Sequence, residues 1–459
     1  MKYEYDTDQL REWALKHLWM HNADWSEMAR TEEPLIIVEG TGLRVRDSNG
    51  KTWIDINGGY ASVAVGYGRQ EIADAAYRQM KQITYFPQRT ANPSTIQLAV
   101  RLAELTPGDL NRSFFASGGS EANETALKIA RACQHRRGAS GRYKIISRRD
   151  SYHGSTGGVL WLGSAAGAPR TDYEPSPPGI LYAPQPLTYR CEFGSTSPAQ
   201  CATRCAEEIE RLILEEHPDT VCAVIAEPIA SGPGAAVPAD EYWPMLREIC
   251  DRYGVLLIAD EVITGFGRTG KLFACDHWGV VPDIMTVAKG MCSSYLPLGA
   301  AIASEAVADS FAGENRMLRH VFTFAGHPVA AAAGLQNIDI LIEEKLVENA
   351  AEVGSYFKEQ LQSLLAEVAI LGDVRGMGLM LSLDFVADRQ TKAQFPKSFG
   401  FSERLNTQLK NRGLLARSHA NHLLNLSPPL CITRSEVDEV TELLRQAIRA
   451  VGESWKQEG

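Results

Sequence analysis

Short apolar runs that end in a polar or charged residue constrain the fold of this 459-residue chain more than any other sequence feature. The runs are YKIIS, CAVIAEP, GVLLIADE and DIMTVAKG, and helical or loop segments separate them. Apolar strands that alternate with helices are typical of a mainly parallel sheet covered by helices on both faces. Ligands of such sheets bind outside the carboxyl ends of the strands, so we expect Glu227, Asp260 and Lys289 to converge on one crevice.

The N-terminal and central segments predict further elements around this sheet. Residues 35–57 alternate apolar and polar side chains around a Ser48-Asn49-Gly50 turn, which is the pattern of a β-hairpin or a short meander. Residues 71–83 and 94–105 have helical spacing. Residues 163–200 are rich in glycine, proline and serine, and they predict a long excursion with little regular structure.

The C-terminal segments predict a second lobe. Residues 335–368 have the periodicity of one long helix, and residues 374–385 resemble a strand. Another helix and the run LLNLSPPL follow, and a terminal helix begins near Ser435. At about 150 residues per domain, a chain of this length predicts roughly three domains, which large α/β proteins often merge into two lobes.

Composition excludes several classes of protein. An apolar fraction of 44% and a charged fraction of 22% are those of a globular protein, and a net charge of -10 disfavours binding to nucleic acid. No apolar run approaches the roughly 18 residues of a membrane span, and the first residues are charged, so we expect a soluble, cytoplasmic protein. The nine cysteines fit a reducing compartment, and Cys201 and Cys205 lack the spacing of a zinc site, so no metal is expected.

The segment FFASGGSEANETALKIARAC predicts an anion site. It has the pattern of a strand, a glycine turn and a helix, with Gly118, Gly119 and Ser120 at the helix start. Free N–H groups and the helix dipole favour negative charge there, and phosphate is the natural ligand. The alternative is a tight turn with an N-cap serine.

Lys289 and Asp260 each end an apolar strand, 29 residues apart, a spacing that fits one crossover between neighbouring strands. A desolvated lysine has a lowered pKa and can form a Schiff base with a carbonyl. A buried carboxylate can keep a pyridine nitrogen protonated, which makes the ring an electron sink. The alternative is a structural ion pair between Asp260 and Lys289.

The sequence GFGRTG contains a formal GxGxxG match at Gly265, Gly267 and Gly270, which would favour an NAD-dependent dehydrogenase. Asp260 and Glu261 separate the strand from the first glycine, and no clear helical period follows the third. The match therefore makes a dehydrogenase only a remote alternative.

Seven motifs dispersed along the chain in order resemble those of class III pyridoxal-phosphate aminotransferases, of fold type I. They are SGGSEANE, Tyr152-His153-Gly154, AEP at 226–228, ADEVITGFGRTG, TVAKG, TFAGHP and SPPL. The stretch SSYLPLGA is similar to that of the ω-amino acid and amine:pyruvate branch. The resemblance implies an α/β fold, with a large domain built on a mainly parallel seven-stranded sheet covered by helices. A smaller α+β domain would come from both termini. The implied boundaries are residues 1–68 and 336–459 for the small domain and 69–335 for the large, cofactor-binding domain.

The resemblance also implies a cofactor, pyridoxal 5'-phosphate, and residues that bind it. Lys289 would form the internal aldimine and act as acid and base, and Asp260 would pair with the pyridinium nitrogen. Tyr152 and Val262 would pack on the two faces of the ring, and Glu227 would lie near the ring hydroxyl. The alternatives are that Tyr152 and Val262 are core residues and that Glu227 is a structural carboxylate at the end of a strand. The full implied set is Gly118, Gly119, Ser120, Tyr152, His153, Glu227, Asp260, Val262, Lys289 and Thr323, of which Thr323 would come from a partner subunit.

The implied activity is the transfer of an amino group from an ω-amino acid or primary amine to pyruvate or a similar 2-oxo acid. The implied assembly is a homodimer with shared active sites, or a tetramer. Arg417 would bind the carboxylate of the substrate, since a guanidinium binds a carboxylate in a bidentate manner. The alternative is a solvated arginine after a strand. Other pocket residues would be Trp19, Tyr60, Phe86 and Trp161. A racemase, a mutase or a decarboxylating transaminase with the same cofactor remains an alternative.

Overall fold

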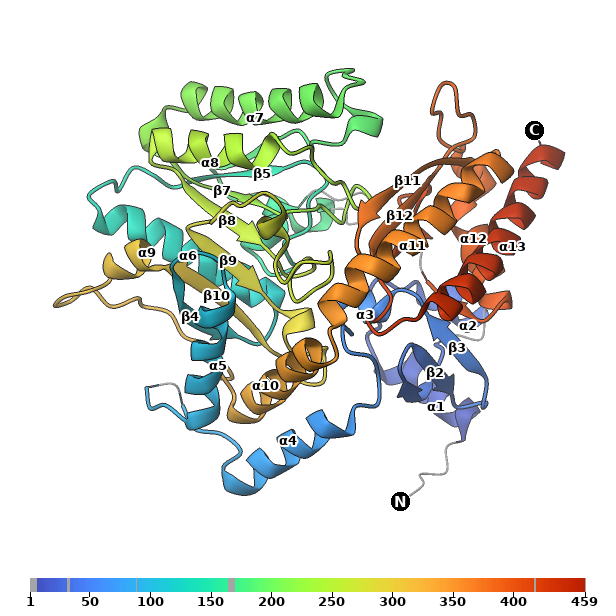
Figure 1. The fold of residues 1–459 in the computed structure, drawn as a ribbon, viewed down its shortest axis with the longest axis horizontal. Coiled ribbons are helices and arrows are strands. Elements are labelled where there is room, and N and C mark those ends of the chain that lie inside the picture. Colours follow the sequence, from blue (N-terminus) through green and yellow to red (C-terminus); the bar gives the residue numbers. More distant parts are fainter. Residues whose placement is uncertain (1–5, 31–33, 88, 164–169, 417, 459) are drawn as a thin grey trace.

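A seven-stranded sheet lies on one side of the molecule, and two four-stranded sheets lie on the other (Figure 1). The structure is a computed structural model, which describes residues 6–30, 34–87, 89–163, 170–416 and 418–458. Within those ranges, no helix combines the length and the apolar character needed to cross a bilayer.

The large sheet is mainly parallel, as predicted. Strand β10 is antiparallel to both of its neighbours, and the other four neighbouring pairs are parallel. In spatial order the strands are β4 (Leu110–Ala116), β10 (Gly299–Ser304), β9 (Ile284–Val287), β8 (Leu256–Asp260), β7 (Val221–Ala226), β5 (Lys144–Arg148) and β6 (Ile180–Ala183).

Helices cover both faces of this sheet, because successive side chains of a strand point to opposite faces. Ile145 packs in the apolar cluster of α6 (Gly119–Arg136). The next residue, Ile146, packs in the cluster of α7 (Pro198–Glu215) and α8 (Tyr242–Tyr253). Strands buried on both faces explain why their sequences are apolar throughout. Residues from the two ends of the chain meet in one of the two smaller sheets.

The first small sheet contains the predicted N-terminal meander and one C-terminal strand, β13, which pairs in parallel with β3. The second small sheet is entirely antiparallel. Their strands are β1 (Ile37–Thr41), β2 (Arg44–Asp47), β3 (Thr52–Asp55) and β13 (Leu414–Leu415), and then β11 (Leu371–Met377), β12 (Met380–Phe385), β15 (Leu423–Leu426) and β14 (Ser418–His419). The domain boundaries given above stay a prediction.

The remaining helices surround these sheets. In Figure 1, α10 lies beside the large sheet with α4 and α5, whereas α11, α12 and α13 lie beside the small sheets. Their bounds are α1 (Thr7–His17), α2 (Trp25–Arg30), α3 (Gly58–Ala61), α4 (Gln70–Gln82), α5 (Pro93–Leu105), α9 (Glu305–Asp309), α10 (Pro328–Glu343), α11 (Leu346–Glu367), α12 (Phe401–Asn411) and α13 (Arg434–Glu458).

Two local predictions were wrong. Residues 335–368 form two helices, α10 and α11, because Lys345 adopts a left-handed conformation with φ 53° just before α11. Residues 374–385 form the hairpin of β11 and β12, which turns at Gly378 with φ +56°. The described part of the excursion at 163–200 has little regular structure, as predicted, and its strand β6 is an edge strand of only four residues. Tertiary packing decided the two wrong cases over the local pattern.

The structure predicts an unusual response to alanine at Gly354 in α11. A Cβ there would lie 2.3 Å from the carbonyl carbon and oxygen of Gly378, so the hairpin turn would have to move. We expect Gly354→Ala to destabilise the protein by about 1–3 kcal/mol, although alanine favours helices over glycine by about 1 kcal/mol. Gly452→Ala in α13 is the control, because its Cβ would meet only Ile370, at 3.6 Å. Thermal unfolding followed by circular dichroism measures both, and equal melting temperatures would contradict this packing.

Candidate active site

A pocket of about 530 Å³, counted to its open mouth, lies where β7, β8 and β9 end and α6 begins. Its position is the one that the sequence predicts for a parallel sheet. Its lining residues are Gly119, Ser120, Asn123, Tyr152, His153, Gly154, Glu227, Ile229, Ser231, Asp260, Val262, Ile263, Thr264 and Lys289. Eight of the ten residues that the resemblance implies for cofactor binding therefore line this one pocket.

Asp260 is the last residue of β8, and its side chain is 3% exposed. Its Oδ2 accepts a hydrogen bond of 2.8 Å from Asn123 Nδ2 and lies 2.7 Å from His153 Nδ1. Its Oδ1 accepts from the backbone N–H of Val262 at 3.1 Å and from Thr286 Oγ1 at 3.3 Å. Four contacts compensate the loss of water and fix the orientation of the carboxylate.

Sequence reasoning did not identify Asn123 and Thr286 as site residues. Asn123 lies on the first turn of α6, and its Oδ1 accepts a hydrogen bond of 2.7 Å from Thr286 Oγ1 on β9. Its Nδ2 also donates to the backbone carbonyl of His153 at 2.8 Å. The available signal was a polar residue one turn after Ser120, on a helix that starts at a proposed anion site.

Lys289 follows β9 by two residues and has a left-handed backbone with φ 43°. Its Nζ donates a hydrogen bond of 2.9 Å to the backbone carbonyl of Tyr60, in the turn α3. Both Lys289 and Asp260 are described by the structure, and no ion pair joins them, so the structural alternative fails. Burial lowers the pKa of Lys289 to about 8, although the negative charge of Asp260 raises it.

Glu227 follows β7 and is 5% exposed. Its Oε1 accepts a hydrogen bond of 3.2 Å from the backbone N–H of Tyr152, and its backbone carbonyl accepts from the buried Arg148. Burial raises the pKa of Glu227 to about 7. Within the described part of the chain, Glu227 Oε2 and His153 Nε2 are buried without a hydrogen-bond partner.

The start of α6 has the geometry of an anion site. A Cβ on Gly118 would meet no atom within 4 Å, so open space adjoins the backbone there. A Cβ on Gly119 would lie 2.7 Å from Val262 Cγ1, so a larger residue would push into the pocket wall. Ser120 Oγ accepts a hydrogen bond of 3.2 Å from the backbone N–H of Ser155. The N-terminus of this 18-residue helix favours a phosphate by its free N–H groups and its dipole.

Other predicted residues lie outside the lining of the pocket. Trp19 is 84% exposed and packs edge-on against Trp25, and Phe86 is half exposed. Trp161 is buried beside Arg170. Tyr60 reaches the site through its carbonyl, while its side chain is 64% exposed. The two remaining predicted residues are Thr323 and Arg417.

Thr323 is exposed, and its carbonyl accepts a hydrogen bond of 2.7 Å from Tyr85 Oη, away from the pocket of its own chain. Arg417 lies outside the described residues. The GxGxxG match also fails as a dinucleotide fingerprint, because residues 261–273 form turns and no helix begins at Gly270.

The donor set fits pyridoxal phosphate. The start of α6 suits the phosphate, Asp260 suits a protonated ring nitrogen, and Lys289 suits the aldehyde. The two unpartnered polar atoms, His153 Nε2 and Glu227 Oε2, are buried at the same pocket and offer additional contacts. This fit depends on the ends of β7, β8 and β9 and the start of α6, which place these residues around one pocket.

Comparison with known proteins agrees with this chemistry. The family model for "Aminotransferase class-III" matches residues 27–448. Putrescine–pyruvate aminotransferase of Pseudomonas aeruginosa is 37% identical, over 90% of this chain and 90% of that protein. Taurine–pyruvate aminotransferase of Bilophila wadsworthia is also 37% identical, over 98% of this chain and 99% of that protein.

Similarity extends to solved structures. A thermostable (S)-enantioselective ω-transaminase from Thermomicrobium roseum superimposes with a TM-score of 0.94 and 40% identity, covering 98% of this chain and 99% of that one. The match confirms the fold-type-I architecture predicted from the motifs. The chain belongs to the class III aminotransferases, enzymes that depend on pyridoxal phosphate.

Proposed function

We propose that this aminotransferase moves an amino group from an ω-amino acid or a primary amine to pyruvate or a similar 2-oxo acid. The observation that carries the proposal is one pocket containing an anion site, a buried carboxylate and a lysine of lowered pKa. When bound, pyridoxal phosphate supplies an electron sink for the carbon that exchanges its amino group. Two relatives whose names pair an amine with pyruvate support the choice of acceptor.

Each end of the cofactor has a proposed binding group in this chain. Gly118, Gly119 and Ser120 would hold the phosphate by backbone N–H groups and a hydroxyl. Asp260 would keep the ring nitrogen protonated, and its four hydrogen-bond contacts support that role because they fix the carboxylate in place. Tyr152 and Val262 would contact the two faces of the ring.

Lys289 would hold the cofactor covalently and move protons at its Nζ. An amine with a pKa of about 8 is partly neutral near pH 7, so it can act as a nucleophile and as a base. The carbonyl of Tyr60 accepts one N–H of Nζ and thereby orients the amine whenever it is free.

Glu227 would donate or accept a hydrogen bond near the ring hydroxyl. Because burial raises its pKa to about 7, its carboxyl group is divided between the two protonation states near neutral pH. Its unpartnered Oε2 supports a contact with bound cofactor. Arg417 as the group that binds the substrate carboxylate stays a prediction, as do the pocket roles of Trp19, Tyr60, Phe86 and Trp161.

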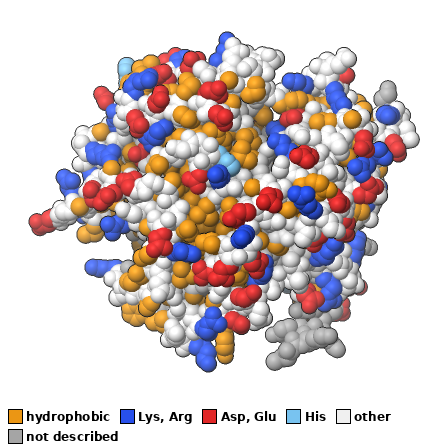
Figure 2. Space-filling model, in the orientation of Figure 1, with side chains coloured by type: hydrophobic (Ala, Val, Ile, Leu, Met, Phe, Trp, Pro, Cys, Tyr) orange, Lys and Arg blue, Asp and Glu red, His pale blue; other side chains and the backbone are white. Residues whose placement is uncertain are grey.

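A homodimer is the proposed assembly. Figure 2 shows hydrophobic side chains gathered over the middle of the face that Figure 1 views. Exposed apolar side chains on α4, α5, the connection between them and residues 317–324 support a partner surface. They are Tyr77, Met80, Ile83, Phe86, Ile96, Val100, Met317, Val321 and Phe324. Exposed Thr323 would reach the pocket of the second subunit.

The first test of this function is a panel of amine donors with pyruvate as acceptor. We expect alanine to form with diamines, ω-amino acids or hydrophobic primary amines as donors, and chromatography measures it. We also expect pyridoxal phosphate to stay covalently attached to the protein after reduction with borohydride. Lys289→Ala should abolish both signals, whereas Lys271→Ala, on an exposed lysine, should keep both. Alanine formation by Lys289→Ala at the rate of the unsubstituted protein would disprove the role of Lys289.

A second test measures the proton on Lys289 in the cofactor-free protein. Burial disfavours the charged amine, so its labelling by acetic anhydride should rise through a midpoint near pH 8; an ordinary lysine titrates at about 10.4. The negative charge of Asp260 raises this pKa, so Asp260→Asn should move the midpoint to lower pH. Mass spectrometry of the peptide that contains Lys289 gives the titration. A midpoint above pH 10 in the unsubstituted protein would show that the amine is not desolvated.

A third test concerns assembly. We expect the protein to sediment at about twice its 50.4 kDa, and Val321→Glu to shift it toward the monomer and lower the rate of amino transfer, because a charge would replace an apolar contact. Leu214→Glu, on an exposed apolar residue of α7, is the control and should remain dimeric. Sedimentation of the unsubstituted protein as a monomer would contradict the proposed assembly.

A further inference from the structure

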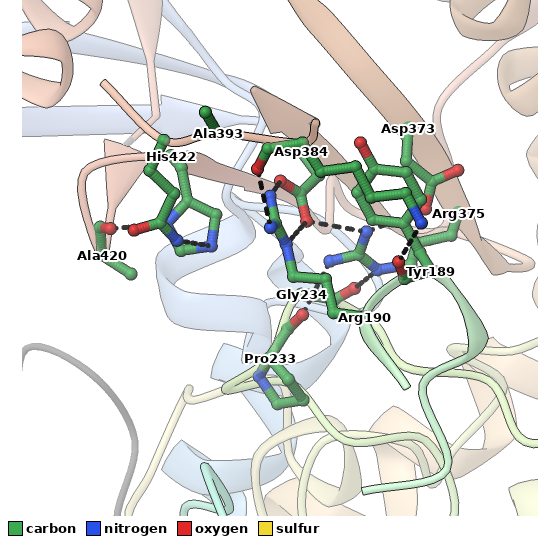
Figure 3. A network of polar contacts seen from close by, with 12 residues as sticks. Tyr189, Arg190, Pro233, Gly234, Asp373, Arg375, Asp384, Ala393, Ala420 and His422 are labelled. Carbon is green, nitrogen blue, oxygen red and sulfur yellow. Dashed lines mark hydrogen bonds and ion pairs between the residues drawn. The ribbon is translucent and has the colours of Figure 1, made fainter. Parts of the chain in front are cut away.

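Two guanidinium groups converge on the buried carboxylate of Asp384 (Figure 3). Asp384 of β12 is fully buried, and Arg190 binds it through Nη2 at 2.8 Å and Nε at 3.3 Å. Arg375 of β11 contacts the same carboxylate at 3.1 Å and Asp373 at 2.8 Å. Two cations and two anions give a network without net charge, which lowers the cost of burying it.

Arg375 has a second set of contacts that Arg190 lacks. Its Nε donates to the carbonyl of Gly234 at 2.5 Å, and its Nη2 donates to the carbonyl of Pro233 at 2.7 Å. Figure 3 shows these two carbonyls on the opposite side of the guanidinium from Asp384. One planar side chain therefore joins a buried ion network to a loop, which a lysine with a single nitrogen could not do in the same way.

The loop that Arg375 holds forms one wall of the active-site pocket. Ile229 and Ser231 line the pocket, and the N–H of Gly234 donates to the carbonyl of Ser231 at 3.1 Å. That carbonyl also accepts from Asn425 Nδ2 at 3.0 Å. Buried backbone carbonyls outside a sheet need such donors.

Apolar contacts fix the same loop to the same strand. Ile229 and Ala235 form a small buried cluster with Met380, the first residue of β12. The loop is closely packed at Gly234, where an added Cβ would lie 2.7 Å from Arg375 Nη2 and 2.8 Å from Ser382 Oγ. A displacement of the Arg375 side chain would therefore also displace the loop that forms the pocket wall.

We propose that Arg375, held in place by Asp384, is a positioning residue for the pocket wall formed by Ile229 and Ser231, and that it thereby sets the affinity of the enzyme for its amine donor. The inference about affinity rests on the proposed function, because it assumes that an amine occupies this pocket. Lys289 and Asp260 are not on this loop, so the chemical step should be affected much less than binding.

The test compares Arg375→Lys with Arg190→Lys in the holoenzyme. Both variants keep a positive charge beside Asp384, but only Arg375→Lys loses the two donors to the carbonyls of Pro233 and Gly234. We expect Arg375→Lys to raise KM for the best amine donor roughly tenfold while kcat changes by less than about threefold, which is the pattern of lost uniform binding. Arg190→Lys should leave KM within about twofold of the original value.

Hydrogen–deuterium exchange of residues 228–236 provides a readout that does not need the reaction. Exchange should become faster in Arg375→Lys and stay unchanged in Arg190→Lys, because local opening follows the loss of specific contacts. Equal KM values in the two variants, or unchanged exchange in Arg375→Lys, would overturn the proposal. If the unsubstituted protein transfers no amino group, the proposed function fails, whereas exchange still decides whether Arg375 holds the loop.

A second variant covers the case in which Arg375→Lys does not fold. In Asp384→Asn, the asparagine has nearly the same shape as aspartate but lacks the negative charge that holds Arg375. This variant should therefore show the same faster exchange and higher KM as Arg375→Lys. Unchanged exchange in a folded Asp384→Asn would also overturn the proposal.

Discussion

The burial of the Asp260 carboxylate at the end of β8 is the constraint on which the pocket depends. Moving a charged group out of water costs several kcal/mol unless it gains hydrogen bonds or opposite charge. The donors come from α6, from the loop after β5 and from β9. The Asp260 carboxylate can therefore be buried only because β8 pairs with β9 in parallel and α6 packs against both strands, which places these donors around it.

The same pocket keeps two polar atoms without partners, His153 Nε2 and Glu227 Oε2. Folded proteins leave few buried polar groups unpaired, and such groups need an explanation. A ligand that contacts them only in the folded state also stabilises that state by mass action. The chemistry of the site and the stability of the fold are therefore coupled through its cofactor.

Much of this arrangement could be predicted from the sequence because it depends on strong local signals. Asp260 ends the apolar strand β8, Lys289 comes two residues after the apolar strand β9, and Gly118 and Gly119 lie at the start of a clear helix. Asn123 could not be identified, because a single amide on a helix has no distinctive pattern until Asp260 is placed beside it. The break between α10 and α11 at Lys345 was missed for a related reason, because no proline or glycine marks it. The two helices have different packing partners: α10 packs on α4 and α5, whereas α11 packs on β11 and α13.

The pairing of β3 with β13 joins Ile54 to Leu414, near opposite ends of the chain. Contacts between such distant residues form slowly, because a very long loop must close before they can contribute. The turn α3, whose Tyr60 carbonyl binds the amine of Lys289, directly follows β3. During synthesis at the ribosome, the large sheet can assemble well before this turn has its C-terminal support. The lysine would then gain its orienting partner only after the last part of the chain has emerged, which delays maturation of the site until synthesis is nearly complete.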